Sequence, residues 1–329
     1  MLLWLHWWNL VRLLRPAFSR NRSFLWFAVI IAGISIRSDF AGITSLVRAL
    51  GVSPRLYQRF LDNMHTSSIR LDTLAKIWMQ IVIRCFPTVR LNGRLVLVGD
   101  GIKVGKEGRK MPAVKSLHQE SGSNSKPSWI MGHSFQALGI IAGTAGYFFS
   151  VPLIARLHEG IVRSNRDRRT LHDKLIAMLS ILGLTTSAYI LLDAYYSNQK
   201  IIKGLLQQGH HLISRMNKNA VAYLPFLQPE KRRRGRPRKY GAKVRFADLF
   251  KTAEFTEAPS PVYGETGINL LYHTIDLIWE PVGHLVRFVL VKHPTRGKCT
   301  FVSTDMSLHA LDIIHAYGLR FKIELSFKQ

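Results

Sequence analysis

Two short, almost wholly apolar runs, each closed by an aspartate, constrain the fold of this 329-residue chain more than any other feature. They are residues 94–100 (RLVLVGD) and residues 187–193 (SAYILLD). Continuous apolar runs of this kind predict buried strands. Helical patterns at residues 170–184 and 199–208 alternate with strand-like runs between residues 146 and 215, which indicates an α/β fold. We therefore expect Asp100 and Asp193 at the carboxyl ends of buried strands.

The charge balance indicates a polyanionic partner. Lys and Arg number 46 against 20 Asp and Glu, a formal net charge of +26. Nucleic acid is the first partner to expect for such an excess, and an anionic membrane surface is the second. Cys85 and Cys299 lie far apart and in no metal-binding spacing, which fits a reducing, cytoplasmic location.

The N-terminal apolar segments favour a buried helix over a membrane anchor. No basic residue precedes the first apolar run, so the chain lacks the pattern of a secretory signal. A helix over residues 24–36 would be about 20 Å long, which is short of a bilayer core of about 30 Å. We expect a core helix and no membrane contact. A basic membrane-associated protein is the competing hypothesis.

Residues 41–61 follow the outline of a helix-turn-helix unit. Gly51 separates two short amphipathic stretches, and Ser53 with Pro54 is a typical helix start. The outward positions carry arginines that are candidate DNA contacts: Arg48, Arg55 and Arg59. An ordinary helical hairpin is the alternative.

A second set of candidate DNA contacts lies in basic segments that interrupt the fold. Residues 231–239 hold seven basic residues in nine around a Gly-Arg-Pro core, a composition that suits phosphate contact or an A·T-rich minor groove. A solvated basic loop is the alternative. A further basic loop follows Asp100. The candidates in the two segments are Lys103, Arg232, Arg233, Arg234, Arg236, Arg238 and Lys239.

The segment before the chain end is predicted to be β-rich and then helical. Residues 243–304 show strand patterns with a hairpin turn at 294–297, and a helix is expected over residues 308–327. Asp305, with Ser307, is predicted to cap that helix, and metal binding by Asp305 is the alternative.

Tyr317, Arg320 and Glu324 lie at offsets of three and four, so one helix face carries all three beside an apolar stripe. One interpretation is an amphipathic helix with an internal Arg–Glu pair. The other is that Glu324 joins Asp100 and Asp193 in a metal site. Carboxylates bind hard divalent ions such as Mg²⁺, and two ions about 4 Å apart suit phosphodiester chemistry.

The motifs around these acids resemble DDE-type transposases of bacterial insertion sequences. The resemblance includes residues 37–50 (RSDFAGITSLVRAL), 98–101 (VGDG), 191–195 (LLDAY) and the Tyr317, Arg320, Glu324 signature. It implies a ribonuclease-H-like mixed-sheet core with a β-rich insertion, preceded by an α-helical N-terminal domain. It also implies that Asp100, Asp193 and Glu324 are catalytic metal ligands for two Mg²⁺ or Mn²⁺ ions. Tyr317 and Arg320 would contact nearby DNA phosphates or support the glutamate.

On this resemblance the chain divides into four parts. Residues 1–90 would bind DNA, residues 91–224 begin the catalytic core, residues 225–304 form the basic loop and insertion, and residues 305–329 carry the catalytic helix. The implied activity is metal-dependent hydrolysis and strand transfer at element ends, by a homodimer on terminal inverted repeats and target DNA. The location would be cytoplasmic, on the nucleoid.

One feature of the family pattern falls outside the chain. The family's lysine follows the glutamate after six intervening residues and would be residue 331, whereas the sequence ends at Gln329. A truncated product is therefore expected. The alternative function is a catalytically inactive DNA-binding remnant.

Overall fold

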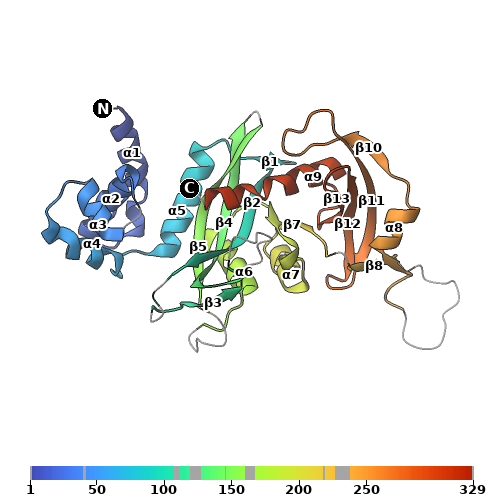
Figure 1. Ribbon diagram of the computed structural model, residues 1–329, viewed down its shortest axis with the longest axis horizontal. Coiled ribbons are helices and arrows are strands. Elements are labelled where there is room, and N and C mark those ends of the chain that lie inside the picture. Colours follow the sequence, from blue (N-terminus) through green and yellow to red (C-terminus); the bar gives the residue numbers. More distant parts are fainter. Residues whose placement is uncertain are drawn as a thin grey trace. The chain divides into compact units, whose positions relative to one another are not determined.

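The computed structural model describes the chain except for residues 1, 40–41, 107, 109–110, 119–126, 145, 160–166, 218, 227–237 and 328–329. The chain forms two compact units, Met1–Cys85 and Phe86–Gln329. Each unit is described separately below (Figure 1).

The first unit is helical. Its α-helices are α1 (Leu2–Leu13), α2 (Asn21–Ile36), α3 (Gly42–Ala49), α4 (Tyr57–Met64) and α5 (Leu71–Cys85). The expected core helix is α2, which buries Phe24, Ala28, Ile30 and Gly33. Gly51 turns the chain after α3 with a φ of 59°, and Ser53 accepts a hydrogen bond from the Arg55 N–H to start the turn before α4. The two-helix outline predicted around Gly51 is therefore present.

Among the residues that the structure describes, the second unit is built on one 13-stranded mixed sheet. Its first half contains β1 (Arg90–Leu91), β2 (Arg94–Gly105), β3 (Lys115–His118), β4 (Trp129–Thr144), β5 (Tyr147–His158), β6 (Ala188–Leu192) and β7 (His211–Arg215). Strands β2, β4 and β5 form an antiparallel meander, and β6 and β7 add in parallel to the other side of β2. This order, with the helices that connect the parallel strands, is the predicted ribonuclease-H-like arrangement.

Helices cover both faces of this core, because β2 and β6 are apolar on both faces. α6 (Leu171–Leu182) and α7 (Gln199–Gln207) lie against one face, as Figure 1 shows. Thr170 and Asn198 cap these two helices. The other face packs against α9 (Ala310–Leu319), and alternate residues such as Val96 and Val98 enter the core there.

The expected β-rich insertion extends the sheet beyond β7. It contains β8 (Val221–Tyr223), β9 (Lys243–Arg245), β10 (Thr256–Pro259), β11 (Asn269–Trp279), β12 (His284–His293) and β13 (Gly297–Ser303). The strand prediction for residues 246–250 is wrong. These residues belong to α8 (Phe246–Thr252), because Phe246 is buried against Phe288 of β12 and tertiary packing outweighs strand propensity.

The prediction of a single helix over residues 308–327 is also wrong. α9 ends at Leu319, and α10 (Lys322–Ser326) follows it. The Arg320 N–H bonds the Tyr317 carbonyl and the Ile323 N–H bonds the Arg320 carbonyl, both three residues back. A short 3₁₀-type turn therefore separates the two helices. α10 packs against β5 and β2.

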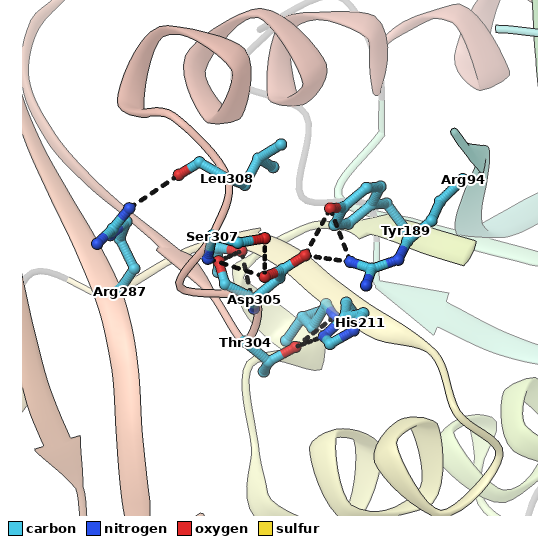
Figure 2. Close-up of polar contacts among 10 residues, drawn as sticks. Arg94, Tyr189, His211, Arg287, Thr304, Asp305, Ser307 and Leu308 are labelled. Carbon is cyan, nitrogen blue, oxygen red and sulfur yellow. Dashed lines mark hydrogen bonds and ion pairs between the residues drawn. The ribbon is translucent and has the colours of Figure 1, made fainter. Parts of the chain in front are cut away.

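A buried polar cluster anchors the connection between β13 and α9 (Figure 2). Asp305 accepts hydrogen bonds from the Tyr189 hydroxyl at 2.6 Å, from the Ser307 N–H at 2.9 Å and from the Ser307 hydroxyl at 2.7 Å, and it also pairs with Arg94. Asp305 does not cap α9, whose N-cap is His309. The cap prediction is wrong because a non-helical turn separates Asp305 from the helix.

Candidate active site

Asp100 and Asp193 lie at the same edge of the sheet. Strands β2 and β6 run parallel, and the last pair in their register joins Val98 to Leu191. Each aspartate stands two residues beyond this pair, Asp100 within the extended part of β2 and Asp193 directly after β6. Since side chains alternate along a strand, Asp100 shares with Val98 the face that packs against α9.

Arg320 connects the first aspartate to Glu324. Its Nη1 lies 3.4 Å from Asp100 Oδ2, and its Nη2 donates to Glu324 Oε1 at 2.9 Å. The Arg320 side chain is 8% exposed, and its Nε has no hydrogen-bond partner among the described residues. The internal Arg–Glu pair is therefore present. The same guanidinium also joins two acids that are 224 residues apart in the sequence: Asp100 lies on β2 and Glu324 on α10.

The electrostatics of Asp100 show that its carboxyl group responds to the other two acids. The pKa of Asp100 is raised to about 6, and burial is the largest cause. The negative charges of Asp193 and Glu324 contribute to this rise, while Arg320 and the Gly101 N–H oppose it. A carboxyl group in such surroundings is stabilised in its charged form by any additional cation nearby.

The donor chemistry of these acids fits a hard divalent ion, since carboxylate oxygens are the ligands that Mg²⁺ and Mn²⁺ prefer. Among the residues that the structure describes, no group of three or more His, Cys, Asp and Glu is close enough together to hold a metal ion. Arg320 lies between Asp100 and Glu324. The acids thus converge on one region with a guanidinium between two of them.

A cavity of about 650 Å³ opens beside Asp193. The insertion contributes Tyr263 and Arg296 to its wall, and α9 contributes Tyr317. Tyr317 packs on the Phe301 ring at 4.8 Å, and burial raises the pKa of Tyr317. Aromatic rings combined with arginines next to an acid are typical of surfaces that hold nucleic-acid strands.

Four buried or partly buried polar residues support the aspartates, and sequence analysis did not single them out. Gln136 donates to the Asp100 carbonyl at 3.0 Å and accepts from the Tyr196 hydroxyl at 2.6 Å. Ser214 donates to the Asp193 carbonyl at 2.9 Å, and Ser197 donates to the Ser214 hydroxyl at 2.7 Å. The sequence did contain a signal for Gln136: it is a glutamine inside the apolar run at residues 134–142, and a buried polar side chain needs a hydrogen-bond partner.

The structure places some of the basic candidates and not others. In the first unit Arg48 pairs with Asp39 at 3.1 Å, and Arg55 and Arg59 are exposed. In the second unit Lys103 donates to the His118 carbonyl at 2.6 Å. Arg238 and Lys239 are exposed. The remaining candidates lie outside the described residues: Arg232, Arg233, Arg234 and Arg236.

A ribonuclease-H-like sheet with acids at one edge defines a class of enzymes that act on nucleic-acid phosphodiesters. Residues 13–260 match the DDE superfamily endonucleases, and the chain belongs to this family. Members of the family act on DNA and generally use divalent metals. Asp100 and Asp193 lie inside the matched residues, and Glu324 lies beyond them.

No curated protein matches the chain. Among the helices that the structure describes, none combines the length and apolar character needed to cross a bilayer.

Proposed function

We propose that the chain is a DNA transposase that cuts and joins strands at the ends of an insertion sequence. The observation that carries this proposal is the placement of Asp100, Asp193 and Glu324. They come from β2, from the end of β6 and from α10, and the charges of Asp193 and Glu324 both raise the pKa of Asp100. This set lies in a chain of net charge +26, whose natural partner is a polyanion.

In this proposal Asp100, Asp193 and Glu324 hold two Mg²⁺ or Mn²⁺ ions. When bound, such ions activate a water or 3′-hydroxyl and stabilise the leaving oxygen. The chain itself positions the DNA. Arg320 and Tyr317 border the acids, and a guanidinium is well suited to bidentate phosphate contact.

The other basic residues would bind DNA away from the reacting phosphate. Arg48, Arg55 and Arg59 present charge on the helical unit, and Lys103 with the 231–239 segment presents charge on the second unit. Contacts of this kind fix the register of a protein on the duplex and make binding salt-dependent. Two copies of the chain on paired element ends complete the proposed complex.

The test is Mg²⁺- or Mn²⁺-dependent nicking of DNA that carries the inverted repeats flanking the gene. Asp193→Asn and Asp100→Asn should lose at least 100-fold in cleavage, because each removes a proposed ligand. Asp248→Asn changes the same charge at an exposed site of α8 and should cleave as the unmodified chain does. Undiminished cleavage by Asp193→Asn would exclude this function.

The position of Arg320 favours one second candidate. A buried guanidinium paired with both Asp100 and Glu324 neutralises part of the charge that metal ions would otherwise balance. A DNA-binding remnant without catalysis fits this arrangement. Salt-dependent DNA binding with no nicking in Mg²⁺ or Mn²⁺ would support it, and turnover by the chain would exclude it.

A further inference from the structure

We infer that Tyr196 and Gln136 are positioning residues that set the separation of Asp100 and Asp193, and thereby the affinity of the site for divalent metal. This inference rests on the proposed function, since it assigns the two aspartates as ligands. It concerns two side chains that touch neither the metal nor the DNA in that proposal.

A buried hydrogen-bond chain joins the two aspartate segments. Tyr196 ends the short 3₁₀ turn Ala194–Tyr196, whose N-cap is Asp193. Its hydroxyl donates to Gln136 Oε1 at 2.6 Å, and Gln136 Nε2 donates to the Asp100 carbonyl at 3.0 Å. Gln136 is 0% exposed and Tyr196 is 2% exposed. Water therefore does not compete for these bonds.

These hydrogen bonds reach the Asp100 backbone from the sheet face opposite to its carboxylate. Gln136 lies opposite Gly101 in the β2–β4 ladder, so it occupies the sheet face opposite to the Asp100 side chain. The Tyr196 hydroxyl lies close to Gly101, 3.7 Å from the position that a Cβ there would take. The ring of His172, from α6, packs edge-on against Tyr196 at 5.5 Å. The bonds thus hold the Asp100 backbone without entering the carboxylate cluster.

The strand ladder alone does not hold the two aspartates together. The register of β2 with β6 ends at Val98 and Leu191, two residues before either acid. Beyond that pair, Leu192 packs over Gly99, and a path of hydrogen bonds through Gln136 and Tyr196 also connects the two segments. Two ligands on separate segments need such support to keep the spacing that a metal ion requires, and loss of comparable supporting residues weakens metal sites 10- to 100-fold.

The test measures Mn²⁺ binding to the full chain by the electron paramagnetic resonance signal of free Mn²⁺, with no activity readout. Tyr196→Phe removes one hydroxyl, and Gln136→Met removes the amide. Each should weaken Mn²⁺ binding about 10-fold or more. Tyr195→Phe is the matched control, because the neighbouring tyrosine is 60% exposed and lies outside the chain of bonds. It should bind Mn²⁺ as the unmodified protein does.

A double variant, Tyr196→Phe with Gln136→Met, separates positioning from stability. It leaves no orphaned polar group between the two side chains, so its melting temperature should return toward that of the unmodified protein. Its Mn²⁺ affinity should remain reduced by the same factor as in either single variant. Recovery of the affinity together with the melting temperature would overturn the inference. Failure of the double variant to fold would overturn it too, since the bonds would then serve folding itself.

Asp193→Asn distinguishes failure of this inference from failure of the proposed function. If Asp193→Asn loses Mn²⁺ binding while the Tyr196 and Gln136 variants keep it, the positioning role is wrong and the metal site stands. If Asp193→Asn binds Mn²⁺ normally, the proposed function is wrong, and the inference falls with it.

Discussion

Replacing Asp305 with asparagine should destabilise the second unit, although Asp305 lies away from the proposed catalytic acids. Asp305 is 7% exposed, and its carboxylate accepts hydrogen bonds from Tyr189 and Ser307 while it pairs with Arg94. Figure 2 shows these side chains converging on Asp305 from separate elements. The change to asparagine keeps the shape of the side chain and removes the charge, so its effect reports on the electrostatic part of the cluster.

The expected cost is about 2–3 kcal/mol. Breaking a buried ion pair typically costs about 3–5 kcal/mol. The Arg94 side chain is 32% exposed, so water partly solvates its charge once the partner is lost, and this reduces the cost. Asparagine retains one acceptor oxygen for Tyr189 or Ser307, while each hydrogen bond to a charged group contributes about 1.5–3 kcal/mol.

The difference in the free energy of unfolding between the unmodified protein and Asp305→Asn should depend on pH in a defined direction. Burial alone would raise the pKa of Asp305, but the hydrogen bonds from Tyr189 and Ser307 outweigh it and hold this pKa well below its usual range. A depressed pKa in the folded state contributes stability above the unfolded value of about 3.9 and loses it as the pH falls. The stability gap should be full at pH 7 and should shrink below about pH 4.

Urea denaturation followed by hydrogen-exchange mass spectrometry makes the measurement, because peptides from residues 86–329 report on their own unit. Asp248→Asn removes an equal charge from an exposed position and should change the free energy of unfolding by less than about 0.5 kcal/mol. If Asp305→Asn matches Asp248→Asn at pH 7, or if the gap grows as the pH falls, the reasoning about this cluster is refuted.

Three further predictions concern packing, capping and DNA binding. Gly99→Ala places a Cβ 2.7 Å from Leu192 Cδ2 in a filled core, and it should cost about 1–3 kcal/mol by urea denaturation; an unchanged midpoint would contradict this packing. Thr170→Ala removes the capping box with Asp173 and should cost about 1 kcal/mol in the same assay, whereas no loss would show that the cap is dispensable. Arg59→Ala should lower the slope of log binding constant against log salt by about 0.9 in fluorescence anisotropy, and an unchanged slope would exclude a phosphate contact.

Local pattern predicted the parts of the core whose signals lie within one segment. The apolar runs before Asp100 and Asp193 are strands because they are buried on both faces, so neither face needs polar residues. The caps at Thr170 and Asn198 were predictable because a cap involves only residues two or three positions away.

The errors occurred where distant contacts decide local structure. Phe246 lies in a helix because it packs on Phe288, which is far away in the sequence. The helical pattern of residues 308–327 does not reveal the 3₁₀-type turn at Arg320, whose side chain is buried next to Asp100 of β2. Propensity and periodicity contain no information about such partners.

By itself the sequence determined the types of residue available for chemistry: a few acids at the ends of apolar runs, a Tyr-Arg-Glu spacing and a large excess of positive charge. Only the tertiary structure decided that Arg320 pairs with both Asp100 and Glu324. It also decided that hydrogen bonds through Gln136 and Tyr196 connect the two aspartate segments on the sheet face opposite to the Asp100 carboxylate. The physical reason is that parallel strand pairing and helix packing set distances between residues that are far apart along the chain, and no local pattern encodes those distances.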